Sequence, residues 1–429
     1  MKILLVAERY WPEVGAAPSR LGNMAEGLLR QGCEVDVLTS LPNYPQGRIF
    51  DGYRGRLSKY EQHRGIGVFR YWIYATVSRS PLARIVNMFS LAVTLWLFAF
   101  KRRRIQGYDT VIIQTPTLVV AASAMLLFKG LYGKRCVLNV SDIWPLTAVD
   151  MGAMRQYSAS YRFMAWLEHY LYRKADGVLG QSEEILNHVA QELLSLQGQW
   201  DDAKEKDTDE VLHADLWRQN PHLFLYRNFQ PRHDDGLQVS PAATFRGENR
   251  PLRLVFCGML GVAQNVAGIV KRVPFRQLGV EFHVIGGGRQ LQEIEDYCQK
   301  HPGCGVFTHG FVAKEQLNGM LQGMDASIVP LTTRIRGAFP SKVFDILPHG
   351  LPVIYCGGGE AAAFIDSRQV GLTCAPGDYV ALAACIKQLR DMSDRDFLAL
   401  SERCQQLGRT ELDFDRQMTA CREFLNVIK

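Results

Sequence analysis

Short apolar runs alternate with amphipathic stretches of helix length along the first half of the chain. An apolar run over 2–7 is followed by a loop, by a helix-like stretch over 20–32 and by a second apolar run over 34–40. This order of strand, helix and strand is the βαβ unit of a parallel sheet. Further strands are expected at 108–114, 134–140 and 175–181, the last before a helix over 183–194. The pattern predicts a first doubly wound domain.

A second alternation of the same type fills the other half. Strands are expected at 253–258, 281–287, 325–331, 351–357 and 371–376. An acidic stretch over 196–222 separates the halves, and we interpret it as a solvated excursion. The predicted fold class is α/β, with two Rossmann-like doubly wound domains over 1–225 and 226–429. Ligands of such sheets bind beyond the carboxyl ends of the strands, so functional residues are expected just after strands, in a cleft between the two sheets.

The composition is that of an ordinary folded protein. Of the 429 residues, 47% are hydrophobic and 21% are charged, which excludes a disordered chain. The ten cysteines form no CxxC pair and the ten histidines no HxxxH pair, so we expect reduced thiols and no metal site. The opening apolar run is too short for a signal peptide, and a cytoplasmic location is expected.

Positive charge is concentrated in one part of the first domain. Residues 54–104 hold eleven lysines and arginines against one acid, Glu61, while the whole chain has a net charge of +6. The segment also holds the longest apolar run, 85–100, whose sixteen residues fall short of the about twenty that span a bilayer. The cations at its ends are Arg84, Lys101, Arg102, Arg103 and Arg104.

This pattern favours a basic amphipathic segment over 79–104 that lies on an anionic membrane surface. A buried core helix with a solvated basic end is the alternative. No nucleic-acid partner is expected.

One motif of the second half has a specific resemblance. The stretch FPSKVFDILPHGLPVI, 339–354, resembles the donor-binding signature of GT-B glycosyltransferases in family 4 of retaining enzymes. In that family a PSK-type turn opens a helix whose acidic residue holds the ribose of the nucleotide, a place that Asp345 takes here. Pro340 suits a first helical turn, and Ser341 and Lys342 beside it suit a diphosphate.

The resemblance implies further donor-binding residues. The segment 255–266 resembles the family's turn after the first strand of the second domain, and 10–22 resembles the glycine loop that closes over the donor. The glycine-rich turn 284–288 also follows a strand. The candidates are Gly15, Gly258, Gln264, Gly287 and Arg336. The chain departs from the family where an acid is expected at Gly337 and where two cations are expected at Met259 and Gln264.

The acceptor side resembles the family in two places. DIWP, which begins at Asp142, resembles a motif that commonly reads Asp-Leu-Trp-Pro, and the stretch 39–55 resembles an acceptor loop with Asn43 and Tyr44. Asp142 and Lys342 are the candidate catalytic residues. Ser141 stands where many members have a histidine, so the general base stays open.

The closest pattern within the family is that of bacterial O-antigen, capsule and exopolysaccharide enzymes, including the L-fucosamine transferase type. It implies transfer, with retention, from a nucleoside-diphosphate sugar, UDP more readily than others, to a polyprenyl-diphosphate-linked saccharide. No metal or cofactor beyond the sugar nucleotide is implied, and the enzyme would associate peripherally with the inner membrane. The last helix is expected to cross back to the first domain. A sugar-nucleotide 2-epimerase of the same fold and a degenerate scaffold remain alternatives.

Overall fold

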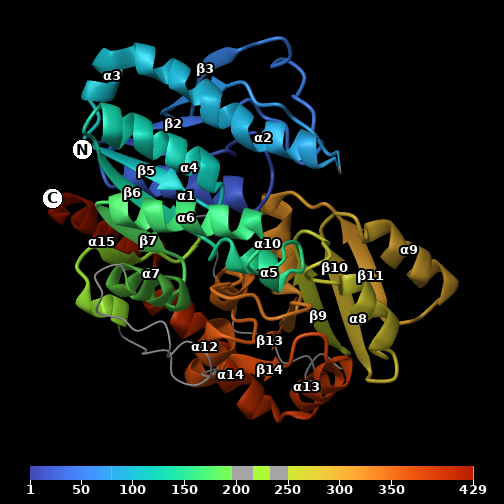
Figure 1. The fold of residues 1–429 in the computed structure, drawn as a ribbon. Helices are drawn as coiled ribbons and strands as arrows, with labels where there is room; N and C mark the ends of the chain where they lie inside the picture. The colour runs from blue at the N-terminus through green and yellow to red at the C-terminus, as the bar shows by residue number, and fades with distance from the viewer. Residues whose placement is uncertain (79, 196–215, 232–249, 429) are drawn as a thin grey trace. The chain divides into compact units, whose positions relative to one another are not determined.

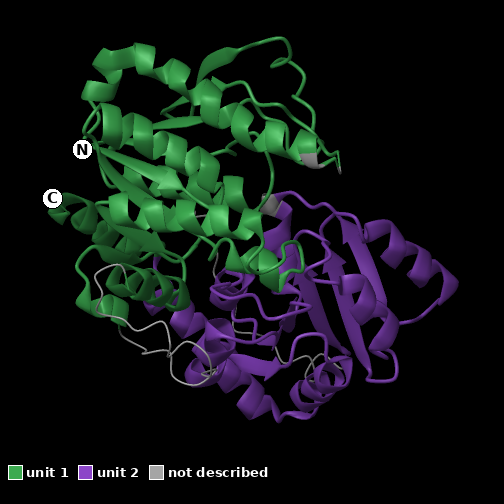
Figure 2. Cartoon of the chain, in the orientation of Figure 1, with its two compact units in different colours: residues 1–231, 414–429 green, residues 232–413 purple. Residues whose placement is uncertain are grey.

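A computed structural model describes the chain except for residues 79, 196–215, 232–249 and 429 (Figure 1). Contacts divide it into two compact units, residues 1–231 with 414–429 and residues 232–413 (Figure 2). The boundary expected from the sequence, between 225 and 226, lies six residues before the observed one. The expected range of the second domain also included the last helix, which the contacts place in the first unit. Most of the acidic excursion lies outside the described residues.

The first unit is built on an eight-stranded sheet with the order β3-β4-β2-β1-β5-β6-β7-β8. All neighbouring strands are parallel except β3 and β4. The strands predicted from the first half are present, as β1 (Lys2–Val6), β2 (Glu34–Ser40), β5 (Thr110–Gln114), β6 (Arg135–Val140) and β7 (Gly177–Gly180). They read as apolar runs because helices cover both of their faces. The short strand β8 (Leu223–Leu225) was not predicted.

A hairpin at the edge of this sheet was also missed. It consists of β3 (Ser58–His63) and β4 (Ile66–Tyr71), joined by Arg64 and Gly65 at φ 49° and 81°. A two-residue turn with both φ values positive matches the twist of an antiparallel pair. All six residues of β4 are buried, whereas β3 has no buried residue. The many cations of this stretch indicated a charged surface, and for that reason the two strands were not predicted.

Helices pack on the two faces of the first sheet. Leu4 and Val6 of β1 belong to the core beneath α4, while Ile3 and Leu5 are buried outside that core. The helices are α1 (Ala16–Arg30), α2 (Pro81–Thr94), η1 (Leu95–Lys101), α3 (Arg102–Gln106), α4 (Leu118–Met125), η2 (Leu126–Leu131), α5 (Leu146–Asp150), α6 (Ala159–Lys174), α7 (Glu183–Ser195) and η4 (Leu216–Gln219).

The second unit has a six-stranded parallel sheet with the order β11-β10-β9-β12-β13-β14. The strands are β9 (Leu252–Cys257), β10 (Val280–Ile285), β11 (Val306–Gly310), β12 (Ala326–Pro330), β13 (Val353–Cys356) and β14 (Gly371–Cys374). Edge strand β11 was not predicted because only Val306 of its residues is buried. The helices are α8 (Val266–Arg272), α9 (Leu291–Lys300), α10 (Lys314–Gln322), α11 (Ser341–Ile346), η5 (Leu347–His349), α12 (Glu360–Arg368), α13 (Tyr379–Asp391) and α14 (Asp394–Thr410).

The last helix, α15 (Phe414–Val427), belongs to the first unit (Figure 2). It packs on α1 at Gly27, where a Cβ atom would lie 2.6 Å from Met418 and 2.8 Å from Phe414. Arg135 of β6 donates from Nη1 to the carbonyl oxygens of Leu425 and Ile428 at 2.8 and 2.7 Å. A cation suits these carbonyls because they have no partner within the helix.

Candidate active site

The predicted donor motif places Lys342 at the end of strand β9. Its Nζ lies 5.1 Å from the centroid of the Phe256 ring. A Cβ atom on Gly258, whose φ is 133°, would lie 2.6 Å from Cε of Lys342 and 3.0 Å from its Nζ. The lysine therefore crosses the position that any other side chain at residue 258 would fill. The structure brings together Lys342 and Gly258, which are far apart in the sequence.

The Lys342 ammonium is held away from water but near a carboxylate. Burial lowers the pKa of Lys342, and the charges of Asp345 and Cys257 oppose that shift. Among the described residues Lys342 has no ion pair within 4.0 Å and no hydrogen bond. Asp345, three residues further along α11, is partly buried. The arrangement leaves one partly buried cation able to accept an anionic ligand.

The glycine-rich turn after β10 packs directly on the turn after β9. The N–H of Gly258 donates to the Ile285 carbonyl and that of Leu260 to the Gly287 carbonyl, both at 2.9 Å. A Cβ atom on Gly286 would lie 1.9 Å from the carbonyl oxygen of Gly258. The glycines thus allow the turn after β10 to approach the turn after β9 closely. Gly287 helps to fix the backbone of Gly258.

Two further donor candidates, Gln264 and Arg336, also lie in the second unit. Gln264 lines a small pocket with Thr332, Asp378 and Tyr379, among others, and this lining includes neither Lys342 nor Asp345. Arg336 is partly buried just before α11. Gly337, which stands where the family has an acid, takes a φ of 73°. That backbone conformation favours glycine and is a physical reason for its presence there.

In the first unit, the glycine loop and the Asn43–Tyr44 loop are joined by Glu13. Its Oε1 accepts the N–H groups of Asn43 and Tyr44, each at 2.8 Å. Burial raises the pKa of Glu13, against the opposing effect of these hydrogen bonds. A Cβ atom on Gly15 would lie 3.3 Å from Cε1 of Tyr44. Glu13 was not a candidate from the sequence, because only the folded chain shows which N–H groups it reaches.

Asn43 and Tyr44 differ in what they leave for a ligand. Nδ2 of Asn43 donates to the Leu41 carbonyl at 3.0 Å, so the buried amide serves its own loop. The ring of Tyr44 is partly exposed and carries the Arg9 guanidinium 4.2 Å from its centroid. Tyr44 is the one of this pair that a ligand can reach.

Asp142 follows strand β6 and faces a cation that sequence analysis missed. Oγ of Ser141 lies 3.1 Å from Oδ2 of Asp142 and 2.8 Å from the Thr115 carbonyl oxygen, and can give its proton to one of them at a time. Burial raises the pKa of Asp142, while the charge of Arg20 and the Ser141 hydroxyl oppose the shift. Burial lowers the pKa of Arg20, against the charges of Asp142 and Tyr226.

Arg20 stands one turn into α1, five residues after Gly15. Its Nε is buried and has no hydrogen-bond partner among the described residues. Guanidinium donors that are buried without acceptors are costly, so the site is suited to an oxygen-rich ligand. In the sequence, the signal that could have indicated Arg20 is a basic residue one turn after the glycine loop.

The basic residues predicted at the membrane are all exposed on one part of the first unit. Arg84 lies on α2, and Lys101, Arg102, Arg103 and Arg104 lie where η1 meets α3. Residue 79, the first of the predicted segment, lies outside the described residues. Within the described part of the chain no group of three or more His, Cys, Asp or Glu side chains could hold a metal ion.

Comparison with known proteins gives the family. The first unit matches the family model described as glycosyl transferase 4-like domain over residues 15–195, and the second matches glycosyl transferases group 1 over residues 251–391. The chain is 35% identical over 392 residues to the putative colanic acid biosynthesis glycosyl transferase WcaI of Escherichia coli (strain K12), covering 90% of this chain and 88% of the relative. The chain is a family 4 glycosyltransferase with the GT-B fold.

Other relatives agree with this assignment. The transferase is 24% identical over 320 residues to the probable glycosyltransferase WbjE of Pseudomonas aeruginosa, 72% of each chain. The solved structure of Anabaena Alr3699/HepE in complex with UDP matches it with a TM-score of 0.64 at 15% identity, over 99% of this chain and 100% of that one. Sucrose-phosphate synthase from Thermosynechococcus elongatus gives 0.67 at 14% identity, over 99% and 98%. These structures support the fold, and the sequence relatives place the transferase in polysaccharide biosynthesis.

Proposed function

We propose that the transferase binds the diphosphate of a UDP-sugar on Lys342. The observation that carries the proposal is the partly buried ammonium beside Gly258, which has no ion pair within 4.0 Å among the described residues. A diphosphate would supply the missing counter-ion and restore the ordinary pKa of the lysine. Asp345, one turn along α11, would accept a hydrogen bond from a ribose hydroxyl.

UDP is the donor nucleotide that the comparisons support best. Alr3699/HepE, a protein of the same fold, has been solved with UDP and with UDP-glucose. The sequence identity between Alr3699/HepE and the transferase is only 15% and 16% in these two complexes. Uracil as the base of the donor nucleotide is therefore part of the proposal.

The proposed reaction proceeds with retention. The bond between the anomeric carbon and the phosphate oxygen breaks, and its electron pair leaves on the diphosphate. The acceptor hydroxyl attacks from the face that the diphosphate leaves, and its proton passes to a diphosphate oxygen. Lys342 would stabilise the charge that develops on the leaving group, which is where a fixed cation lowers the barrier most. This route needs neither a protein nucleophile nor a metal ion.

The acceptor in this proposal is a saccharide linked to polyprenyl diphosphate, met at the cytoplasmic face of the inner membrane. Two observations support this acceptor: the relative from Escherichia coli is named for colanic acid biosynthesis, and α2, η1 and α3 carry exposed apolar and basic side chains. Asp142 would accept a hydrogen bond from an acceptor hydroxyl and Arg20 would donate to acceptor oxygens. The raised pKa of Asp142 makes its carboxylate a stronger proton acceptor than a solvated one.

A thermal-shift screen tests the donor part of the proposal. UDP, GDP, ADP, dTDP and CMP are compared, since a ligand that binds only the folded state raises Tm. At about 100 times its Kd, UDP should raise Tm by roughly 5 °C or more. Lys342→Ala should abolish the shift, whereas Lys387→Ala, at an exposed lysine of α13, should keep it. No shift with any nucleotide would support a scaffold without donor binding.

A further inference from the structure

The outward side of α2 and η1 carries large apolar side chains at helical spacing. The most exposed are Leu82 at 69%, Val93 at 68% and Phe100 at 87%. Others on the same side are Ile85, Val86, Phe89 and Trp96, each at least 39% exposed. Positions three and four apart lie on one face of a helix. Such a contiguous apolar surface is unusual on a soluble domain and indicates a partner.

The inward side of the same helices is part of the core. Leu91, Leu95, Phe98 and Ile105 are 0–2% exposed. The polar residues that interrupt the apolar run bind the chain leaving β4. Nδ2 of Asn87 donates to the Tyr74 carbonyl at 2.6 Å, and Oγ1 of Thr94 donates to the Trp72 carbonyl at 2.6 Å. These contacts hold the helix flat on the first unit.

The length argument against spanning therefore needs correction. The helical segment runs over Leu82–Gln106, 25 residues, which by length and composition could cross a membrane. The apolar run of sixteen residues underestimated it, because the flanking basic residues are helical too. Only 22% of its most apolar window is buried, but spanning is opposed by packing, since a spanning helix would have to expose Leu95 and Phe98 and break the contacts to the Trp72 and Tyr74 carbonyls.

A second helix widens the apolar surface. Leu126 and Leu131 of η2 are 50% and 61% exposed. Nε1 of Trp96 donates to Oγ of Ser123 at 2.9 Å, and the Tyr132 hydroxyl donates to the Ala99 carbonyl at 2.7 Å, which fixes α4 and η2 beside α2 and η1. We call the combined surface the outer face. It consists of Leu82, Ile85, Val86, Phe89, Val93, Trp96, Phe100, Leu126 and Leu131.

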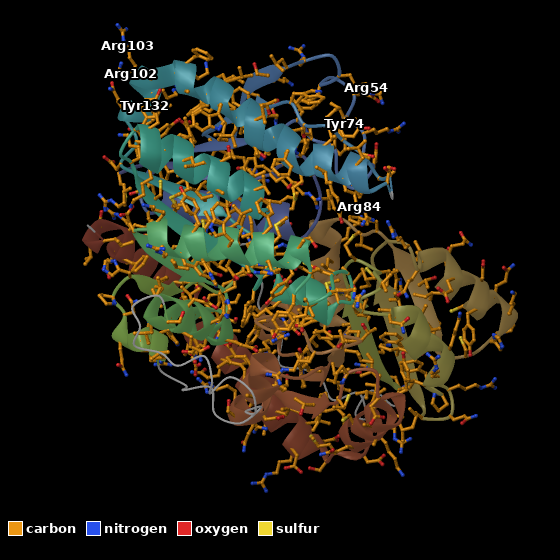
Figure 3. The ribbon with its side chains drawn as sticks, in the orientation of Figure 1. Arg54, Tyr74, Arg84, Arg102, Arg103 and Tyr132 are labelled. Atoms are coloured by element: carbon orange, nitrogen blue, oxygen red, sulfur yellow. The ribbon has the colours of Figure 1, made fainter. Side chains whose placement is uncertain are left out.

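Arginines stand at both ends of the outer face. Figure 3 shows Arg84 at one end of the helical segment and Arg102 and Arg103 at the other. All three are exposed, and none has an ion pair within 4.0 Å among the described residues. Arg102 comes eighteen positions after Arg84, roughly 30 Å along a helix. Lys101 and Arg104 instead lie over the Phe69 ring, at 5.8 and 4.8 Å.

We propose that the outer face, with Arg84, Arg102 and Arg103, is a monotopic membrane-binding surface that lies in the interface of an anionic phospholipid bilayer. The apolar side chains enter the boundary between head groups and acyl chains while the arginines bind lipid phosphates. This inference rests on the helices and their charges alone and is independent of which donor the enzyme uses.

The charges favour a bilayer over a second copy of the chain. In a two-fold dimer the same patch meets itself. An antiparallel arrangement of the two helices would bring Arg84 of each copy to Arg102 and Arg103 of the other, and a parallel one would bring like residues together. Glu61, the one acid in the sequence from 54 to 104, is already bound by Tyr53, Lys59 and Arg70. A surface of anionic head groups supplies the missing counter-charge.

Co-sedimentation of the full-length protein with vesicles tests the inference. The vesicles consist of phosphatidylcholine with or without phosphatidylglycerol. Arg102→Ala with Arg103→Ala should weaken binding to the anionic vesicles by roughly thirtyfold, at about tenfold per 1.4 kcal/mol and about 1 kcal/mol for each cation. Val93→Ser with Phe100→Ser, at exposed positions that leave the core intact, should also weaken vesicle binding. This effect should be greater at high salt, where the apolar contribution to binding dominates.

Matched controls come from the second unit. Arg395→Ala on α14 and Val380→Ser on α13, which is 82% exposed, should bind as the wild type does. Binding that is unchanged by both outer-face variants would overturn the proposal. So would binding that salt abolishes completely and that Val93→Ser with Phe100→Ser leaves unaltered, because the outer face would then not enter the bilayer. A dimer in sedimentation velocity that Val93→Ser with Phe100→Ser dissociates would assign the outer face to a second copy.

Discussion

Gly258 and Lys342 depend on each other at the level of single atoms. The motif around Lys342 could be predicted from the sequence, because a proline, a cation and an acid at fixed spacing on one helix form a local pattern. The need for glycine at residue 258 could be predicted only from a resemblance. Its physical reason, the lysine that crosses the place of a Cβ atom, comes from tertiary structure. The same holds for Glu13 and Arg20, whose partners are distant in sequence.

Gly258→Ala should impair donor binding. The new methyl group would displace the Lys342 side chain, and a φ of 133° strains any residue other than glycine. Loss of a charge-assisted contact of about 1.5–3 kcal/mol corresponds to a roughly 10- to 150-fold increase in the Kd for UDP. Isothermal titration calorimetry measures it. Gly319→Ala, in α10 with no atom within 4 Å of its Cβ position, is the control, and equal affinities for the two variants would contradict this role of Gly258.

The affinity for the donor should also decrease as pH rises. Because burial lowers the pKa of Lys342 in the free protein, its charge is lost at a lower pH than that of a solvated lysine, as pH rises through that pKa. A diphosphate binds the charged form, so UDP binding should be coupled to proton uptake by Lys342, and the affinity should fall as pH rises through the pKa of the free lysine. Calorimetry in buffers of different ionisation enthalpy measures the proton uptake.

Lys342→Arg separates this effect from the titration of uracil. Arginine stays charged throughout the range, so the variant reports the contribution of the nucleotide alone. Identical pH dependence of UDP binding in the wild type and in Lys342→Arg would show that the lysine does not contact the diphosphate.

At the scale of elements, the parallel strands were predicted well and the edge strands poorly. Strands such as β1 and β6 are apolar throughout because both faces are covered, and that pattern is visible in the sequence. β3 and β11 expose much of their length and carry polar residues that resemble a loop. The path of α15 was predicted from the family, and the structure adds its physical basis, the contact at Gly27 and the bonds from Arg135.

The hairpin that was not predicted supports the glycine loop of the candidate site through Arg70, which is 0% exposed. Its Nε donates to Oε1 of Glu61 at 2.5 Å, its Nη1 donates to the Ser40 carbonyl at 3.3 Å, and its Nη2 donates to the Trp11 carbonyl. The strand β4 thereby holds the loop that leads to Gly15. Charge in this segment thus serves two purposes, since Arg70 is buried as a structural cation while Arg102 and Arg103 face outward.

Arg70→Met should destabilise the first unit by about 2–3 kcal/mol, because three acceptors lose their donor. The effect should depend on pH through Glu61. Burial acts to raise the pKa of Glu61, but the hydrogen bonds of Arg70, Lys59 and Tyr53 together outweigh it and hold the pKa below its ordinary value of 4.5. The stabilisation is therefore present above that value and is lost as pH falls through the lowered pKa.

Urea unfolding of the wild type and of Arg70→Met, at neutral pH and in the acid range, measures both effects. The difference in the free energy of unfolding should be largest near neutral pH and should shrink as Glu61 is protonated. A difference that stays constant down to acid pH would show that the pair of Arg70 with Glu61 is not the source.

At the scale of the whole molecule, the chain has two units with separate cores, to which the proposals assign different tasks. The second unit carries Lys342 and Asp345, and the first carries Asp142, Arg20 and the outer face. The basic segment of the first unit has a charge that exceeds the net +6 of the chain, so the remainder is net negative. The fold class could be predicted from the alternating pattern, whereas the division of roles is what the family resemblance implies. The outer face could be predicted only in part, since η2 joins it through tertiary packing.

Sugar transfer by Lys342 variants tests the central claim most directly. Each enzyme variant is incubated with a UDP-sugar that the wild type turns over and with a polyprenyl-diphosphate-linked saccharide in anionic vesicles. The release of UDP and the mass of the lipid product are then measured. We predict a product one sugar heavier, formed by the wild type and by Lys387→Ala, and a rate at least about 100-fold lower for Lys342→Ala. Transfer by Lys342→Ala at the wild-type rate would contradict the account.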